Sequence, residues 1–256
     1  MKTLLEPTAT QAEKASLNSF GFIFLILLLS ADVAFILIHC SYTLYRFLLH
    51  IPTVDNKYLL LDFDKGYAEA FQYIKEFWIA GLLAFIGFRT RKFFFFAWSL
   101  LFLYFLLDDS LSIHEKLGNT LSGYLAFATQ FKLEANDLGE LIASAFFGFV
   151  LLSIIGLSTY LSSRKIKLIS LDLAILLGVL IFFGVGMDVL HAIARSIPGS
   201  GILTLVEDGG EMMAMSLICW YAASLLESVL KKDADFVSPL NWLYLRFERH
   251  KFIRSK

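Results

Sequence analysis

Six long apolar segments constrain this chain more than any other feature of its sequence. Each is long enough to cross about 30 Å of hydrocarbon as an α-helix. Of the 256 residues, 57% are hydrophobic and only 18% are charged, and the mean hydropathy is +0.68. The expected spans are residues 18–48, 68–88, 93–115, 138–161, 168–194 and 202–230. The sequence therefore predicts an all-α integral membrane protein with six transmembrane helices.

The basic residues predict how these helices are oriented. Most of the 22 Lys and Arg residues lie in the N-terminal segment, in the links after the second and fourth helices, and in the C-terminal tail. With six spans, these segments share one side, which the positive-inside rule assigns to the cytoplasm. We expect a cytoplasmic segment 1–17, a six-helix domain 18–231 and a cytoplasmic, basic, amphipathic tail 232–256. Both termini are then cytoplasmic.

The remaining composition narrows the class of protein. A formal net charge of −1 gives no bulk attraction to nucleic acid. The two cysteines, Cys40 and Cys219, are predicted at different depths, so no disulfide framework is expected. The sequence has no Asn-x-Ser/Thr sequon, which favours a bacterial inner (plasma) membrane. The oligomeric state is left open.

Acidic and histidine side chains gather at the end of the bundle that is expected to face the extracytoplasmic side. Such side chains are costly in a membrane, so a one-sided group of them is a functional-site hypothesis. Helices 3 to 6 each bring carboxylates to one depth, and they are expected to form a bundle around this site. The candidate metal ligands are Asp108, His114, Glu140, Asp188, His191, Glu207 and Glu211.

Spacing within the helices supports a shared site. If the third helix continues to residue 115, then Asp108, Ser112 and Glu115 lie on one face. Asp188 and His191 are three residues apart, so both can reach one ion. The latter pair is a shortened version of the Glu-x-x-His element of di-iron helix bundles, an analogy of composition only.

Carboxylate and imidazole ligands suit zinc, iron or manganese, with one or two ions in the site. A metal with an open coordination position lowers the pKa of bound water toward about 7. Asp109 and Glu115 are the candidate residues for moving the proton. These features favour a metal-dependent membrane enzyme that acts on a lipid or another apolar substrate, as a hydrolase or as a di-iron-type oxidase.

Other functions stay open at this stage. An acidic outer vestibule also suits a cation- or proton-coupled transporter or channel, although the inner halves of the helices offer few polar residues, and Asp32 and Asp172 alone make a thin pathway. An accessory subunit of a membrane complex is a third class. A bis-histidine haem would use two of His39, His114 and His191.

The acids also have a purely structural interpretation, as helix ends neutralised by Lys116, Lys132 and Arg195. Glu69 and Glu76 are expected at the surface or outside the ligand set, because Lys65 and Lys75 adjoin them. The link 116–137 is apolar but too short to span, so it is predicted to be an interfacial or re-entrant helix over the site. The run Phe93–Phe96 is interpreted as lipid-facing packing.

Overall fold

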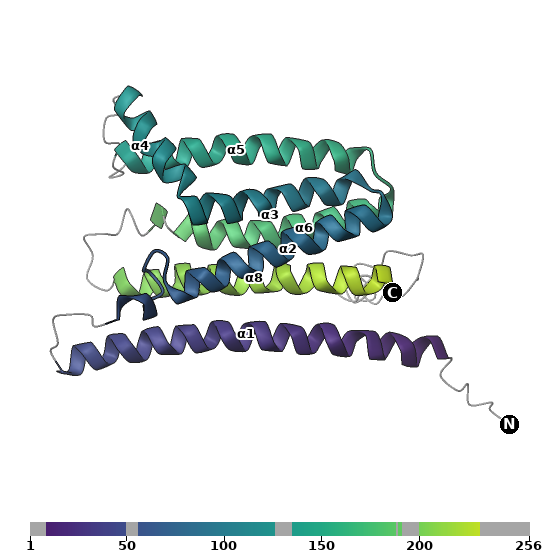
Figure 1. Cartoon of the computed structure of the whole chain (residues 1–256), viewed down its shortest axis with the longest axis horizontal. Helices are drawn as coiled ribbons and strands as arrows, with labels where there is room; N and C mark the ends of the chain where they lie inside the picture. Colours follow the sequence, from purple (N-terminus) through teal and green to yellow (C-terminus); the bar gives the residue numbers. More distant parts are fainter. Residues whose placement is uncertain (1–8, 50–55, 126–134, 188, 191–199, 231–256) are drawn as a thin grey trace, which may run out of the picture.

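The structure, a computed structural model, describes residues 9–49, 56–125, 135–187, 189–190 and 200–230 (Figure 1). This part of the chain forms seven α-helices and no β-strand. The helices are α1 (Ala9–Leu49), α2 (Tyr67–Thr90), α3 (Phe93–Leu111), α4 (Ile113–Leu125), α5 (Ala135–Tyr160), α6 (Arg164–Ile181) and α8 (Ser200–Leu230). A 3-10 turn, η1 (Lys57–Leu59), precedes α2, and a π-helical turn, η2 (Phe182–Gly186), continues α6.

Six of these helices are long and apolar enough to cross a membrane, which confirms the predicted number of candidate spans. The spans are Gly21–Leu49, Tyr67–Thr90, Phe93–Leu111, Ala135–Tyr160, Arg164–Gly186 and Leu203–Leu230. The seventh helix, α4, falls in the link where a short helix was predicted. The predicted amphipathic tail lies outside the described residues.

The bundle is built around α2, which packs against α3 on one side and α8 on the other. Beyond these, α1 packs against α8 at one edge of the bundle and α5 packs against α3 at the other (Figure 1). The chain direction alternates, so α3 ends where α2, α5 and α8 begin, at the end that also carries α4 (Figure 1, left). We call this the site end, because Asp108 at the end of α3 and His114 in α4 lie there.

The core between α2 and α3 corrects the interpretation of the phenylalanine run. Phe94 and Phe95 are 2% and 0% exposed and pack with the buried Trp98. Only Phe93, at 66%, is fully on the outside. Successive residues of an α-helix point about 100° apart, so four of them cannot share a lipid-facing side.

A buried ion pair joins α1, α2 and α8 near the middle of their spans. The Lys75 ammonium donates to Asp32 Oδ1 at 3.0 Å, to the Met212 carbonyl at 2.8 Å and to Ser216 Oγ at 3.3 Å. The Ser216 hydroxyl in turn donates to Asp32 Oδ2 at 2.5 Å. All three side chains are 0% exposed. This network fixes the rotation of α2 about its own axis relative to α1 and α8.

The contact between α4 and α5 depends on two glycines. A β-carbon on Gly139 would lie 2.3 Å from the carbonyl oxygen of Gly118, and one on Gly118 would lie 2.6 Å from the amide nitrogen of Glu140. Both obstacles are backbone atoms, which cannot move aside as a flexible side chain can. The two glycines therefore allow α4 to lie against the first turns of α5.

We predict that Gly139→Ala separates α4 from α5 and destabilises the protein by about 1–3 kcal/mol, the usual cost of overpacking. The measurement is thermal unfolding in detergent. The matched control is Gly148→Ala on the same helix, where a β-carbon meets no atom within 4 Å. Because alanine favours a helix over glycine, the control should be neutral or stabilising. Equal melting temperatures for the two variants would contradict the prediction.

Candidate functional site

The site begins at a break between α3 and α4. Ser112 adopts the left-handed conformation, with φ 49° and ψ 54°. The prediction that one helix continues to residue 115 is therefore wrong, and Asp108, Ser112 and Glu115 do not share a helix face. The break is stabilised locally: the Ser112 amide donates to the Asp108 carbonyl, and the His114 amide donates to Asp108 Oδ1 at 2.8 Å. Asp108 thus satisfies a free N–H group in the first turn of α4.

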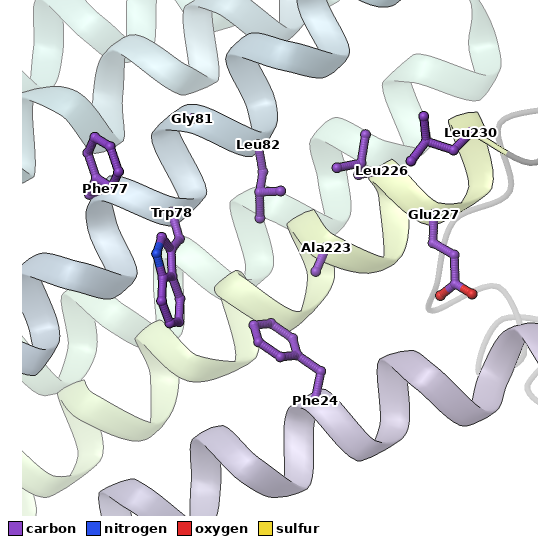
Figure 2. A pocket seen from close by; sticks show the side chains of 9 residues that line it. All are labelled: Phe24, Phe77, Trp78, Gly81, Leu82, Ala223, Leu226, Glu227 and Leu230. Carbon is purple, nitrogen blue, oxygen red and sulfur yellow. The ribbon is translucent and has the colours of Figure 1, made fainter.

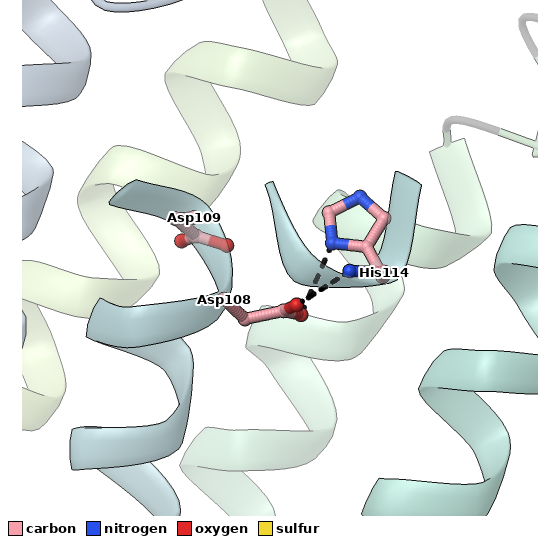
Figure 3. Close-up of side chains that lie close together, drawn as sticks. All are labelled: Asp108, Asp109 and His114. Atoms are coloured by element: carbon pink, nitrogen blue, oxygen red, sulfur yellow. Dashed lines mark hydrogen bonds and ion pairs between the residues drawn. The ribbon is translucent and has the colours of Figure 1, made fainter. Parts of the chain in front are cut away.

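The same carboxylate holds the His114 imidazole. His114 Nδ1 lies 3.1 Å from Asp108 Oδ2 (Figure 3). The hydrogen bond to Asp108 is the main reason that the pKa of His114 is raised above 6.5. Partial burial opposes this rise, and the negative charges of Asp108, Asp109 and Glu115 add to it. The imidazole is therefore biased toward its protonated form, unless another cation replaces the proton.

Three of the predicted site residues come together at this break. Asp108, Asp109 and His114 each offer one ligand atom, and these atoms lie within 4.8 Å of one another (Figure 3). Asp108 is buried, and the other two are half-buried. Two carboxylate oxygens and an imidazole nitrogen at this separation are donor types that zinc, iron and manganese accept.

Glu76 of α2 extends this group into the bundle. It is 0% exposed, and no N–H or hydroxyl donor of the described residues reaches either of its carboxylate oxygens. Its side chain instead lies beside the carboxyl group of Asp109, with which it interacts electrostatically. Two carboxyl groups in such contact must share a proton or a bound cation. The expectation that Glu76 lies at the surface or plays an outer role is corrected: it is a buried member of the acidic group.

Glu211 adds a carboxylate from α8. Its Oε1 accepts a hydrogen bond from Gln72 Nε2 of α2 at 3.4 Å. A β-carbon on Gly184, in the π-helical turn η2, would lie 3.5 Å from Glu211 Oε2, so this turn passes close to the carboxylate. Glu211 interacts electrostatically with Asp109 and with Glu207 on the preceding turn of α8. We call Glu76, Asp108, Asp109, His114 and Glu211 the acidic cluster.

Tyr73 supports the cluster from α2. Its hydroxyl lies in short contact with Glu69 and donates to the Asp109 carbonyl at 3.3 Å. Glu69 also accepts a hydrogen bond from the Lys65 amide, just before α2 begins. Glu69 therefore orients Tyr73, and Tyr73 ties the last turn of α3 to α2.

The other predicted ligands are placed in different ways. Asp188 and His191 lie outside the described residues. Glu140 lies at the α4–α5 contact, where it packs against Gly118. Glu115, a candidate for proton transfer, is exposed on the first turn of α4.

The interpretation that lysine and arginine side chains neutralise the acids can be compared with the structure only at Lys116. The Lys116 ammonium donates to the Leu111 carbonyl at 2.6 Å, so it stabilises the end of α3. Lys132 and Arg195 lie outside the described residues. His39, named for a haem, accepts a hydrogen bond from the Leu61 amide at 3.0 Å.

The sequence analysis left Glu76 and Gln72, the part of the site that α2 contributes, outside the ligand set. The available signal was the spacing of Glu69, Gln72 and Glu76, which places polar side chains on one stripe of an apolar helix. The adjacent lysine obscured it, because Lys75 pairs with Asp32 on a different face of α2 and does not neutralise Glu76.

We predict that His114 titrates above its ordinary pKa of 6.5 in chelator-treated protein, and that Asp108→Asn lowers this value. Since the folded-state pKa is raised, the ion pair stabilises the fold fully below about pH 6.5, and this contribution is lost as pH rises through the folded-state pKa. The measurement is NMR titration of labelled histidine, assigned with His114→Gln. Glu115→Gln removes a carboxylate that interacts more weakly with His114, so it should shift the titration midpoint less than Asp108→Asn does. An unchanged midpoint in Asp108→Asn would contradict the prediction.

Comparison of the sequence with known proteins and protein families identifies the family of this chain. No curated protein and no solved structure matches this chain. A family model described as a domain of unknown function (DUF8692) matches residues 22–225, which include all six spans in whole or in large part. The match covers well over half of the chain, so the protein belongs to the DUF8692 family.

Proposed function

We propose that this protein is a metal-dependent integral membrane enzyme with its site in the acidic cluster. The observation that carries the proposal is the meeting of Asp108, Asp109 and His114 within 4.8 Å, directly beside the buried carboxylate of Glu76. Buried carboxylates that lack donors must be neutralised by protons or by a cation. A divalent cation would satisfy several of them at once.

The proposed ligands follow from the geometry. Asp108, Asp109 and His114 would form the centre of the site, and Glu211 and Glu76 would approach it from α8 and α2. Asp188, His191, Glu207 and Glu140 remain candidates for a second ion or for completing the first. Zinc, iron and manganese all accept this mixture of oxygen and nitrogen donors.

The chemistry we propose uses metal-activated water in hydrolysis, with oxidation at a di-iron-type centre as the variant. Glu115, exposed at the start of α4, would exchange the proton with solvent. Asp108, Asp109 and His114 lie where the span of α3 ends, a depth at which lipid headgroups meet acyl chains. The substrate is accordingly proposed to be a lipid or another apolar compound, reached from the leaflet at the site end.

A second function, cation- or proton-coupled transport, is favoured by one separate observation. Asp32 and Asp172 are both 0% exposed and both hydrogen-bonded, Asp32 to Lys75 and Ser216, and Asp172 to the Tyr221 hydroxyl at 2.7 Å. Buried, partnered charges within spans are typical of ion pathways. They place polar groups deeper in the bundle than the acidic cluster alone.

The enzyme proposal predicts one or two equivalents of zinc, iron or manganese in detergent-purified wild-type protein. His114→Ala and Asp109→Asn should each lose the metal, because each removes one of the three clustered ligands. Glu115→Gln should keep it, since Glu115 is exposed and outside the cluster. The measurement is elemental mass spectrometry on monodisperse fractions, before and after reconstitution with each metal. Wild-type protein that binds none of the three metals would rule out the proposal.

The transport alternative predicts proton or cation flux into proteoliposomes under an imposed gradient. Asp32→Asn should reduce the flux to that of empty liposomes, because it removes the acidic partner of Lys75. Asp172→Asn, which can still accept from Tyr221, tests the second buried acid. Asp64→Asn, at an exposed position before α2, is the control and should behave as wild type. Wild-type flux equal to that of empty liposomes would exclude transport.

A further inference from the structure

A groove of about 670 Å³ lies between α1, α2 and α8, and it extends from Trp78 of α2 to Leu230, where α8 ends. Its walls are formed by apolar side chains and one carboxylate (Figure 2). Phe24 of α1 and Trp78 of α2 lie across from each other, with ring centroids 6.4 Å apart. Ala223 of α8 lies along one wall, and Glu227 lies toward the end of α8.

The groove exists because α1 packs on α8 and only slightly on α2. Gly81 faces this space from α2, and a β-carbon there would meet no atom within 4 Å. Beside it, Phe77 and Trp78 are 62% and 40% exposed. The volume is in the range of small-molecule sites, about 300–1,000 Å³. The space is therefore large enough for a ligand and is not filled by the described side chains.

The surroundings determine what kind of ligand fits. Every lining residue belongs to a membrane span: α1 from Gly21, α2 from Tyr67, and α8 to Leu230. In a bilayer, a lateral opening between spans faces acyl chains rather than water. A flexible hydrocarbon chain matches the apolar walls, whereas a polar ligand would lose hydration without gaining hydrogen bonds.

The charged side chain among the lining residues, Glu227, lies at one end of the groove. Glu227 lies in the last turn of α8, so its carboxylate is at the depth of a headgroup, and the aromatic pair lies deeper, toward the middle of the spans. A positively charged group complements a carboxylate at this position, whereas an anionic headgroup is disfavoured there.

We propose that this groove binds one acyl chain of a phospholipid that has an ammonium headgroup, such as phosphatidylethanolamine, with the ammonium near Glu227 and the chain running past Gly81 toward Trp78. This binding site is separate from the acidic cluster, and it does not depend on the proposed enzyme activity.

The test uses full-length protein reconstituted in an equimolar mixture of phosphatidylethanolamine and phosphatidylglycerol, then re-extracted in mild detergent. Retained lipid is counted by mass spectrometry. Wild type should keep about one phosphatidylethanolamine per chain. Gly81→Trp, which fills the groove, should reduce retention about tenfold. Gly156→Trp places the same side chain at another exposed, open glycine, on α5 outside the groove, and should retain lipid as wild type does. Glu227→Gln should keep a lipid but lose the preference between headgroups.

Some outcomes would overturn the proposal. Gly81→Trp protein that retains as much lipid as the Gly156→Trp control would show that the retained lipid lies elsewhere. Equal retention of the two phospholipids by the wild type would remove the role of Glu227. An apolar compound other than a phospholipid, found in the wild type and lost in Gly81→Trp, would assign the groove to a different ligand.

Discussion

The buried ammonium of Lys75 is the interaction on which the rest of the bundle depends. Removing a charge from water costs several kcal/mol even after the protein relaxes, and losing one partner of a buried pair costs about 3–5 kcal/mol. Lys75 meets this cost with three acceptors, one from α1 and two from α8. α1 otherwise lies at the edge of the bundle with much of its surface exposed. The ion pair therefore attaches α1 at a defined register.

The same interaction determines where the acids of α2 point. Consecutive residues of an α-helix differ by about 100° around the axis. If Lys75 faces α1 and α8, then Glu76 is turned toward α3, where it meets Asp109. Gln72 lies one turn before Glu76 and reaches Glu211. A network between α1, α2 and α8 thus orients carboxylates that belong to the acidic cluster, although Lys75 itself donates to other groups.

The fold was largely predictable from the sequence because spanning a bilayer is a local requirement. An apolar run of sufficient length is visible in the sequence, whatever it packs against, and six such runs became six helices. The errors concern contacts and single turns. Four phenylalanines in a row look alike by composition, yet helix geometry directs Phe94 and Phe95 inward and Phe93 outward. Nothing in the sequence indicates which neighbour each side meets.

The site was predictable in part for the same reason. Asp108, Asp109 and His114 are close in sequence, so a short turn brings them together. The break at Ser112 was not foreseen, because neither glycine nor proline marks it; the Asp108 carboxylate stabilises it by accepting the His114 amide. Glu76 and Lys75 adjoin in sequence and look like mutual partners. Only the packing of α2 shows that Lys75 pairs with Asp32 while Glu76 pairs with Asp109.

Charge balance differs between the two buried polar groups, and the difference bears on function. At mid-depth, the Asp32 carboxylate meets the Lys75 ammonium, so that group is neutral overall and fully hydrogen-bonded. In the acidic cluster, the described residues bring together four carboxyl groups and one imidazole. The same cost of an unpaired buried charge applies to both. In the mid-depth group, the Lys75 ammonium balances the Asp32 carboxylate. In the acidic cluster, the carboxyl groups outnumber the imidazole, so additional positive charge must come from bound protons or from a metal ion. That requirement is the reason for proposing the metal site in the cluster rather than at the Lys75 ion pair.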